Sequence, residues 1–289
     1  ISGLGGSLLT SFSAQGTGLT GALPAISSAI QVLNLAGNNF TGGLPTISGP
    51  LQVLDLSGSG LSGALQLTGS LAGLTNLNLA GNGFTGVLPT ISGPLQVLDL
   101  SGNALSGALQ LTGSLSGLTK LNLDGNTFGG ALPNLMPSAS VLTSLSVPGN
   151  QFTGSLPTGT FDALKVLNVA GNSFSGGVTL FAPLLEVVDL SSNLLGGEFG
   201  LSSTLSNLQV LNLSNNAFLG ALPVFDDAGA LRILDGSLNA FTGALGLAGN
   251  FPLLETLNLS GNKLLGPVPA LAASTLLKVV DLHDNLLDG

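Results

Sequence analysis

The chain has no cysteine, tryptophan or tyrosine, and only 7% of its residues are charged. Without cysteine it can form neither disulfides nor thiolate metal sites, although this absence does not by itself separate the cytosol from the exterior. Tyr and Trp are two of the side chains that most often anchor protein interfaces, and the chain has neither. No residue pattern indicates a bound metal or cofactor, and we expect none.

Positive charge is also scarce, with 5 Lys and Arg residues against 14 Asp and Glu, for a net charge of −9. There is no basic stripe to neutralise phosphates, so nucleic acid is excluded as a partner and anionic membranes are disfavoured. No apolar run approaches the roughly eighteen residues of a membrane span, so we expect no membrane insertion. The first residues lack the basic and apolar segments of a secretion signal, so we expect that any such signal has been removed or lies outside this sequence.

What fills the chain instead is one phrase, Leu-x-x-Leu-x-Leu-x-x-Asn-x-Phe-x-Gly-x-Leu-Pro, repeated every 21 to 24 residues. A period of this length indicates a solenoid whose turns bury their apolar residues against one another. We therefore expect a single domain over residues 1–289. The thirteen copies begin at Leu9, Ile30, Leu51, Leu74, Leu95, Leu118, Leu142, Leu164, Leu185, Leu208, Leu231, Leu254 and Leu277.

Within each copy, the fourth and sixth places alternate with solvent-facing ones, which is the period-2 pattern of a short strand with one buried face. The strands of successive copies should form one parallel sheet on the concave face. The segments that return along the convex face, such as residues 46–50, lack a helical pattern and should form loops or 3₁₀ turns. The predicted fold class is an α/β-type repeat solenoid that is mostly β.

Two columns of residues look structural. The ninth place is Asn in eleven copies, where a buried amide can bond to the backbone of adjacent turns. The eleventh place is Phe or Leu, and a regular aromatic column is typical of a core. The Phe residues of this column are Phe40, Phe84, Phe128, Phe152, Phe174, Phe218 and Phe241.

The copy that begins at Leu231 breaks the pattern, because Gly236 occupies the sixth place where a core Leu belongs. A missing core Leu typically costs a few kcal/mol. We expect Leu238, two residues later, to turn inward and fill the gap.

The Asn-x-Phe-x-Gly-x-Leu-Pro portion resembles the plant-type leucine-rich repeats of receptor-kinase ectodomains and polygalacturonase-inhibitor-like proteins, over essentially the whole chain. The paired cysteines that cap that family's repeats are missing here. The resemblance implies a leucine-rich-repeat superhelix, an extracellular or cell-surface location, and the binding of peptides, proteins or carbohydrates on the concave or lateral surface.

Two columns on the concave face are candidates for contact with a partner. At the fifth place Asn and Asp alternate, so each Asn can donate to a neighbouring Asp. Such a ladder is either self-satisfied or a line of carboxylates that could collect Ca²⁺ or sugar hydroxyls. The third place is mostly β-branched, which suits any strand but also forms an exposed apolar stripe. The candidate contact residues are Val32, Asn34, Val53, Asp55, Asn78, Val97, Asp99, Asn122, Val166, Asn168, Val187, Asp189, Val210, Asn212, Ile233, Asp235, Val279 and Asp281.

The twelfth place carries a column of hydroxyl residues, for example Thr41, Ser62, Thr85 and Ser106. Regular hydroxyls on a flat face suit an ice-binding surface or an O-glycosylated one. N-glycosylation sequons begin at Asn39, Asn212 and Asn258, a number that chance alone would give, and Asn39 is the most accessible of them.

Catalytic chemistry is not indicated. Residues 16–21, 58–63 and 81–86 match the dinucleotide fingerprint, but each is the turn of a repeat with no helix to receive a pyrophosphate. The one histidine, His283, lies between Asp281 and Asp284 without an enclosing pocket. We therefore expect no enzymatic activity.

The sequence leaves three functions open. Both ends lack polar caps, and residues 40–58 and 84–102 are nearly identical. These features favour an extracellular structural protein that assembles end to end through its uncapped edges. The alternative is a ligand-binding ectodomain of the receptor or inhibitor type, and ice binding is a more distant third.

Overall fold

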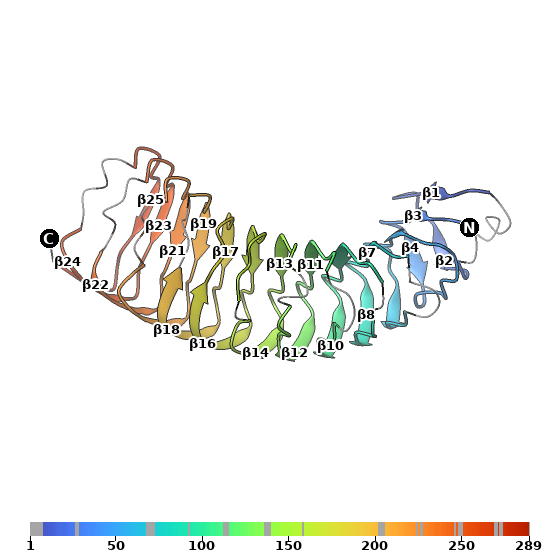
Figure 1. The fold of residues 1–289 in the computed structure, drawn as a ribbon, viewed down its shortest axis with the longest axis horizontal. Coiled ribbons are helices and arrows are strands. Elements are labelled where there is room, and N and C mark those ends of the chain that lie inside the picture. Colours follow the sequence, from blue (N-terminus) through green and yellow to red (C-terminus); the bar gives the residue numbers. More distant parts are fainter. Residues whose placement is uncertain are drawn as a thin grey trace. The chain divides into compact units, whose positions relative to one another are not determined.

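Every repeat contributes two short β-strands to the structure, a computed structural model (Figure 1). The structure describes residues 8–26, 29–67, 73–91, 93–111, 116–135, 140–157, 159–201, 206–223, 225, 228–245, 247, 251–268, 271 and 274–288. The chain divides into two compact units. The first is Ile1–Leu142 with Gly149–Gln151, and the second is Thr143–Pro148 with Phe152–Gly289.

The Leu-x-x-Leu-x-Leu segments form the odd-numbered strands, as predicted. Each is three residues long, and from β3 to β23 a buried Leu or Val is flanked by two more exposed residues. Neighbouring strands are parallel and in register, so that Val32 pairs with Val53 and Asn34 with Asp55. The odd strands of the first unit are β1 (Ser11–Ser13), β3 (Val32–Asn34), β5 (Val53–Asp55), β7 (Asn76–Asn78), β9 (Val97–Asp99) and β11 (Lys120–Asn122).

The odd strands of the second unit pair in the same way, and their third-place and fifth-place residues form straight columns. We call the exposed side of these strands, in either unit, the odd-strand face. The strands are β13 (Ser144–Ser146), β15 (Val166–Asn168), β17 (Val187–Asp189), β19 (Val210–Asn212), β21 (Ile233–Asp235), β23 (Thr256–Asn258) and β25 (Val279–Asp281).

The prediction of a single sheet was wrong, because the Asn-x-Phe-x-Gly segments form a second set of parallel strands. In the first unit β2 pairs with β4, and β6, β8, β10 and β12 pair in that order. These even strands are β2 (Thr20–Ala22), β4 (Asn39–Thr41), β6 (Ser62–Ala64), β8 (Gly83–Val87), β10 (Ala104–Ala108) and β12 (Thr127–Ala131).

The even strands of the second unit reach eight residues in β16 and β18. They are β14 (Gln151–Gly154, whose Gln151 is grouped with the first unit), β16 (Ser173–Leu180), β18 (Leu194–Leu201), β20 (Ala217–Gly220), β22 (Ala240–Ala244), β24 (Lys263–Gly266) and β26 (Leu286–Leu287). Here a twelfth-place residue pairs with a tenth-place residue of the next strand, as in Leu219 with Ala240. The columns of this sheet therefore run obliquely across the strands.

The second sheet was not predicted from the sequence because its strands contain glycine. Gly86 lies inside β8 with φ at 84°, a conformation that other residues rarely adopt, and glycine is disfavoured within strands. The buried Phe84 and exposed Thr85 nevertheless alternate as a strand requires. The expected absence of helices in the return segments is confirmed in the described part of the chain, where turns and bends also replace the expected 3₁₀ turns. Among the described residues, no helix follows the three glycine-rich turns at residues 16–21, 58–63 and 81–86 either.

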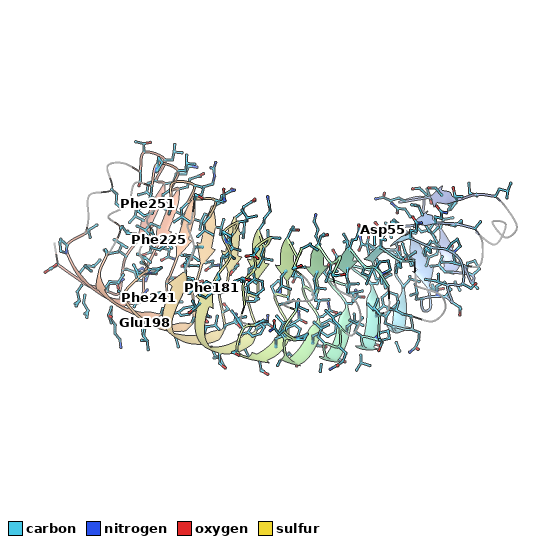
Figure 2. The ribbon with its side chains drawn as sticks, in the orientation of Figure 1. Asp55, Phe181, Glu198, Phe225, Phe241 and Phe251 are labelled. Atoms are coloured by element: carbon cyan, nitrogen blue, oxygen red, sulfur yellow. The ribbon has the colours of Figure 1, made fainter. Side chains whose placement is uncertain are left out.

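The predicted aromatic core is confirmed. Every Phe of the eleventh-place column is at most 3% exposed. In the second unit the rings stack between successive turns, with centroids 6.0 Å apart for Phe152 and Phe174 and 6.1 Å apart for Phe218 and Phe241. Figure 2 shows Phe241 and Phe251 inside this unit, where both are buried.

The ninth-place asparagines tie each turn to the preceding one, also as predicted. Asn193 Nδ2 donates to the carbonyls of Val169, Leu190 and Ser191 at 3.0 to 3.1 Å. Its Oδ1 accepts the N–H of Phe174 at 3.0 Å. One side chain thus satisfies backbone groups in two turns, including one in β16, and burying any of these groups without a partner would cost about 1 to 3 kcal/mol. In the first unit Ser59, which is fully buried, takes this place in one copy.

The expectation that Leu238 fills the gap at Gly236 was wrong. Leu238 is 59% exposed, and its φ of 54° points the side chain away from the core. The side chains of Leu259 and Phe241 occupy the space instead, within 3.0 and 3.5 Å of where a Cβ on Gly236 would lie. Most other copies have glycine at the eighth place, so this copy carries the usual Leu and Gly in exchanged positions.

We expect Leu238→Asn to raise the free energy of unfolding by about 0.5 to 1 kcal/mol, because a left-handed backbone costs most residues about 1 kcal/mol or more whereas asparagine tolerates it. Asn215 already occupies the same place of the preceding copy with φ at 55°. Urea denaturation measures the change. Leu238→Ala is the matched control and should gain less, since alanine keeps the strain; equal stability of the two variants would contradict this account.

Candidate functional site

The odd-strand face combines an apolar column with a polar one. Val187 and Val210 of the third place are half-buried, and Ile233 and Val279 are 38% and 50% exposed. The fifth-place residues are half-buried beside them, for example Asn168, Asp189 and Asn212 on adjacent strands. Asp55 in Figure 2 belongs to the same column in the first unit. The structure therefore places the predicted contact residues on one kind of surface within each unit.

The fifth-place side chains also cap the turn that follows each odd strand, a role that the sequence analysis missed. Asp189 Oδ1 accepts both the N–H and the hydroxyl of Ser191, at 3.0 and 2.6 Å. Asn212 Oδ1 accepts the same two groups from Ser214, at 3.1 and 2.7 Å. The Asp-Leu-Ser and Asn-Leu-Ser spacing was the available signal, because Asp and Asn favour bonds to the backbone two residues on. These caps fix the orientation of the column.

The predicted Asn-to-Asp ladder is present in only two places. Asn122 Nδ2 donates to Asp99 Oδ2 at 3.1 Å, and Asn258 Nδ2 donates to Asp235 Oδ2 at 3.5 Å. We call these the closed pairs. Because the first oxygen of each Asp is already used by a turn cap, the closed pairs leave little hydrogen-bonding capacity for a ligand.

Between these pairs the column has unused groups. Within the described residues, Asn168 Nδ2, Asp189 Oδ2 and Asn212 Nδ2 have no protein partner, and we call these three residues the open triad. In the first unit, Nδ2 of Asn78 and the second oxygen of Asp55 likewise have no protein partner within the described residues, whereas the first oxygen of each side chain caps the following turn. Asn34 reaches Gln15 only at 3.5 Å. The ladder is therefore not self-satisfied along its length.

The second-place column, also missed by the sequence analysis, carries the ion pairs of the second unit. Lys165 Nζ lies 2.8 Å from Glu186 Oε1. Arg232 and Lys278 both contact Glu255, at 2.9 and 2.6 Å, and these hydrogen bonds, with that from Lys278 the larger, lower the pKa of the glutamate. Exposed pairs of this kind add little stability. In the first unit the described second-place residues are uncharged, namely Thr10, Gln31, Gln52, Thr75, Gln96 and Thr119.

The three sequons differ in accessibility. Asn39 is exposed on β4. Asn212 and Asn258 are half-buried on odd strands, and each accepts a hydrogen bond from the hydroxyl of its own sequon serine, at 2.7 and 2.8 Å. The structure thus agrees with the prediction that Asn39 is the most accessible of the three.

No group of His, Asp and Glu residues in the described part of the chain is arranged to hold a metal ion. A search of the described residues for a helix long and apolar enough to cross a membrane also found none.

With this geometry in place, comparison with known proteins identifies the repeats. The leucine-rich-repeat family model matches residues 29–49, 73–93, 207–225 and 253–273, so the chain carries leucine-rich repeats. No curated protein matches the chain by sequence. Solved structures match it over most of its length.

The ectodomain of the Arabidopsis thaliana receptor kinase GASSHO1/SCHENGEN3, solved in complex with CASPARIAN STRIP INTEGRITY FACTOR 2, is 27% identical, with a TM-score of 0.75 over 89% of this chain and 33% of that one. The Arabidopsis receptor kinase HAESA, in complex with the peptide hormone IDA and the co-receptor SERK1, is 24% identical with a TM-score of 0.80, over 96% of this chain and 54% of that one. The chain thus resembles plant receptor-kinase ectodomains and spans about a third to a half of their length.

A plant ice-binding protein shares the fold as well. It is 24% identical, with a TM-score of 0.59, over 83% of this chain and 81% of that one.

His283 gives the odd-strand face a pH-sensitive group in the last repeat. Its Nδ1 lies 2.5 Å from Asp281 Oδ1, and this hydrogen bond, with smaller help from the charges of Asp281 and Asp284, raises the histidine pKa above its ordinary value of 6.5. Because the folded state favours the protonated form, the contact stabilises the protein below pH 6.5 and is lost as the pH rises through the raised pKa. The same contact lowers the pKa of Asp281.

We expect NMR titration of this single histidine to give a pKa above 6.5, and Asp281→Asn to return it towards 6.5. Asp288→Asn is the control, because it removes a carboxylate outside the contact and should leave the value nearly unchanged. An equal shift in both variants would show that general charge, and not the Asp281 contact, sets this pKa.

Proposed function

We propose that this protein is a non-catalytic, extracellular ligand-binding protein of the leucine-rich-repeat type, which binds a peptide, protein or carbohydrate on its odd-strand face. The observation that carries the proposal is the set of unused donors and acceptors beside the valine column. These polar side chains are held in place by the turns that they cap, and they lie next to an apolar stripe. Binding sites have the same combination of a few fixed polar groups and apolar contacts.

The similarity to receptor ectodomains that bind a peptide hormone or an integrity factor supports the same proposal. Those structures are also the basis for the extracellular location. No comparison supports the end-to-end assembly that the sequence alone had favoured, so we place ligand binding first.

A pair of lysine substitutions on each face tests the proposal. We expect Val187→Lys with Val210→Lys to abolish binding of a ligand found by screening the protein against arrays of secreted peptides and oligosaccharides, because two charged side chains would cover the apolar column. Ser175→Lys with Thr242→Lys on the even strands adds the same charge and should leave affinity within about twofold. Surface plasmon resonance measures both, and loss of binding only in the even-strand variant would refute the proposal.

Ice binding is a second candidate, favoured by the unexpected second sheet. On β6, β8 and β10 the outward side carries Ser62, Thr85 and Ser106 among Gly, Ala and Val, without any charge. The plant ice-binding protein shares the fold. The register of the even strands places Ser62 opposite Gly83 and Thr85 opposite Ala104, and not opposite the next twelfth-place hydroxyl, which makes this surface less regular than the sequence suggested.

If the even strands bind ice, the protein should show thermal hysteresis in a nanolitre osmometer, and Thr85→Tyr should remove most of it by breaking the flat surface. Thr75→Tyr in the second-place column of the first unit is the control and should retain it. Absence of hysteresis at millimolar protein concentration excludes this function.

A further inference from the structure

We propose that the open triad of Asn168, Asp189 and Asn212 binds a neutral oligosaccharide that lies along the column, across strands β15, β17 and β19. The inference rests on the proposed ligand-binding function and names the ligand class and its position. It begins from the alternation of the unused groups, which are an amide donor, a carboxylate acceptor and a second amide donor. All three are half-buried and held by turn caps.

The spacing of these groups selects against a peptide backbone. Adjacent strands are about 4.8 Å apart, so the two amide donors recur at about 9.6 Å. Along one edge of an extended peptide, the same group recurs every two residues, or about 6.6 Å. A peptide lying along the column would therefore lose register after its first pair of hydrogen bonds.

Hydroxyl groups do not have this restriction. Each hydroxyl donates one hydrogen bond and accepts up to two, so it can pair with Asp189 or with either asparagine. A chain of sugars that presents a hydroxyl to each turn satisfies the whole triad without matching a fixed donor and acceptor order. The column thus suits a polyhydroxylated ligand better than a polyamide.

The neighbouring columns complete the surface. Val166, Val187 and Val210 lie beside the triad on the same strands and offer an apolar stripe for the C–H groups of sugar rings. On the far side of the valines, Lys165 is already paired with Glu186. The carboxylate of Asp189 and the net charge of −9 disfavour acidic sugars, so the ligand should be neutral.

The extent of the site follows from what flanks it. On one side the column continues to the closed pair of Asp235 and Asn258. On the other side Ser146 replaces the amide or carboxylate and pairs in register with Asn168. Between Ser146 and the closed pair, the oriented, unengaged groups of the column are therefore confined to three successive turns.

The closed pair provides a matched control for the test. Asp189→Asn and Asp235→Asn each remove one charge from the same column and keep an oxygen for the turn cap, but only Asp189 has an unengaged oxygen. The probes are neutral hexasaccharides of β-1,4-linked glucose, β-1,3-linked glucose and β-1,4-linked mannose, titrated into the intact chain by calorimetry. We expect at least one to bind. Asp189→Asn should weaken that binding about tenfold, because hydrogen bonds to a charged acceptor are the stronger kind, and Asp235→Asn should change it less than twofold.

A second pair of variants separates contact from charge. Val187→Glu places a bulky carboxylate in the apolar stripe and should abolish binding, whereas Ile233→Glu beside the closed pair should leave it within threefold. Equal effects of Asp189→Asn and Asp235→Asn, or unimpaired binding by Val187→Glu, overturn the assignment. If no hexasaccharide binds while a peptide does so through the odd-strand face, this inference fails and the proposed function stands. Failure of every ligand to depend on that face removes both.

Discussion

The ninth-place asparagine is the interaction on which the rest of the structure depends. A solenoid turn has few backbone hydrogen bonds of its own, and each polar group left unpaired in its interior would cost about 1 to 3 kcal/mol. One amide pairs such groups in two turns at once. Asn193 donates to carbonyls of its own turn and of the preceding turn, and it accepts the N–H of Phe174. The stacked phenylalanines and the straight odd-strand columns exist because this bond is repeated.

Much of the fold could be predicted from the sequence because the repeated phrase contains the complete description of one turn. The buried columns, the odd strands and the absence of helices in the described return segments follow from periodicities of two residues and of one repeat. The second sheet could not, because its strands contain glycines such as Gly86, which single-residue propensities assign to turns. It depends instead on a pairing partner supplied by the next repeat, which is tertiary information. The prediction that Leu238 turns inward was wrong for a related reason, because the side chains of Leu259 and Phe241 fill the space beside Gly236.

The sequence predicted which columns of residues form the candidate site, but not which of their polar groups lack a hydrogen-bond partner in the protein. Which Asn and Asp residues pair with each other is decided by side-chain geometry, and Asn122 and Asn258 donate to their neighbours whereas Asn168 and Asn212 do not. The caps at Ser191 and Ser214 are local and were readable from the spacing of Asp or Asn and Ser. The ion pairs of the second-place column required comparison between repeats, because their partners are more than twenty residues apart in the chain.

The in-register pairing of the odd strands means that a ligand seated at one turn meets almost the same surface one strand away. In a perfectly uniform column, such a ligand would have many nearly equal positions and could shift among them without dissociating. The serine at position 146 and the closed pair at Asp235 break this translational symmetry within the second unit. A regular repeat can thus define a unique binding position through the few turns that depart from the pattern. These irregular turns determine where the ligand binds, and the regular turns supply the framework.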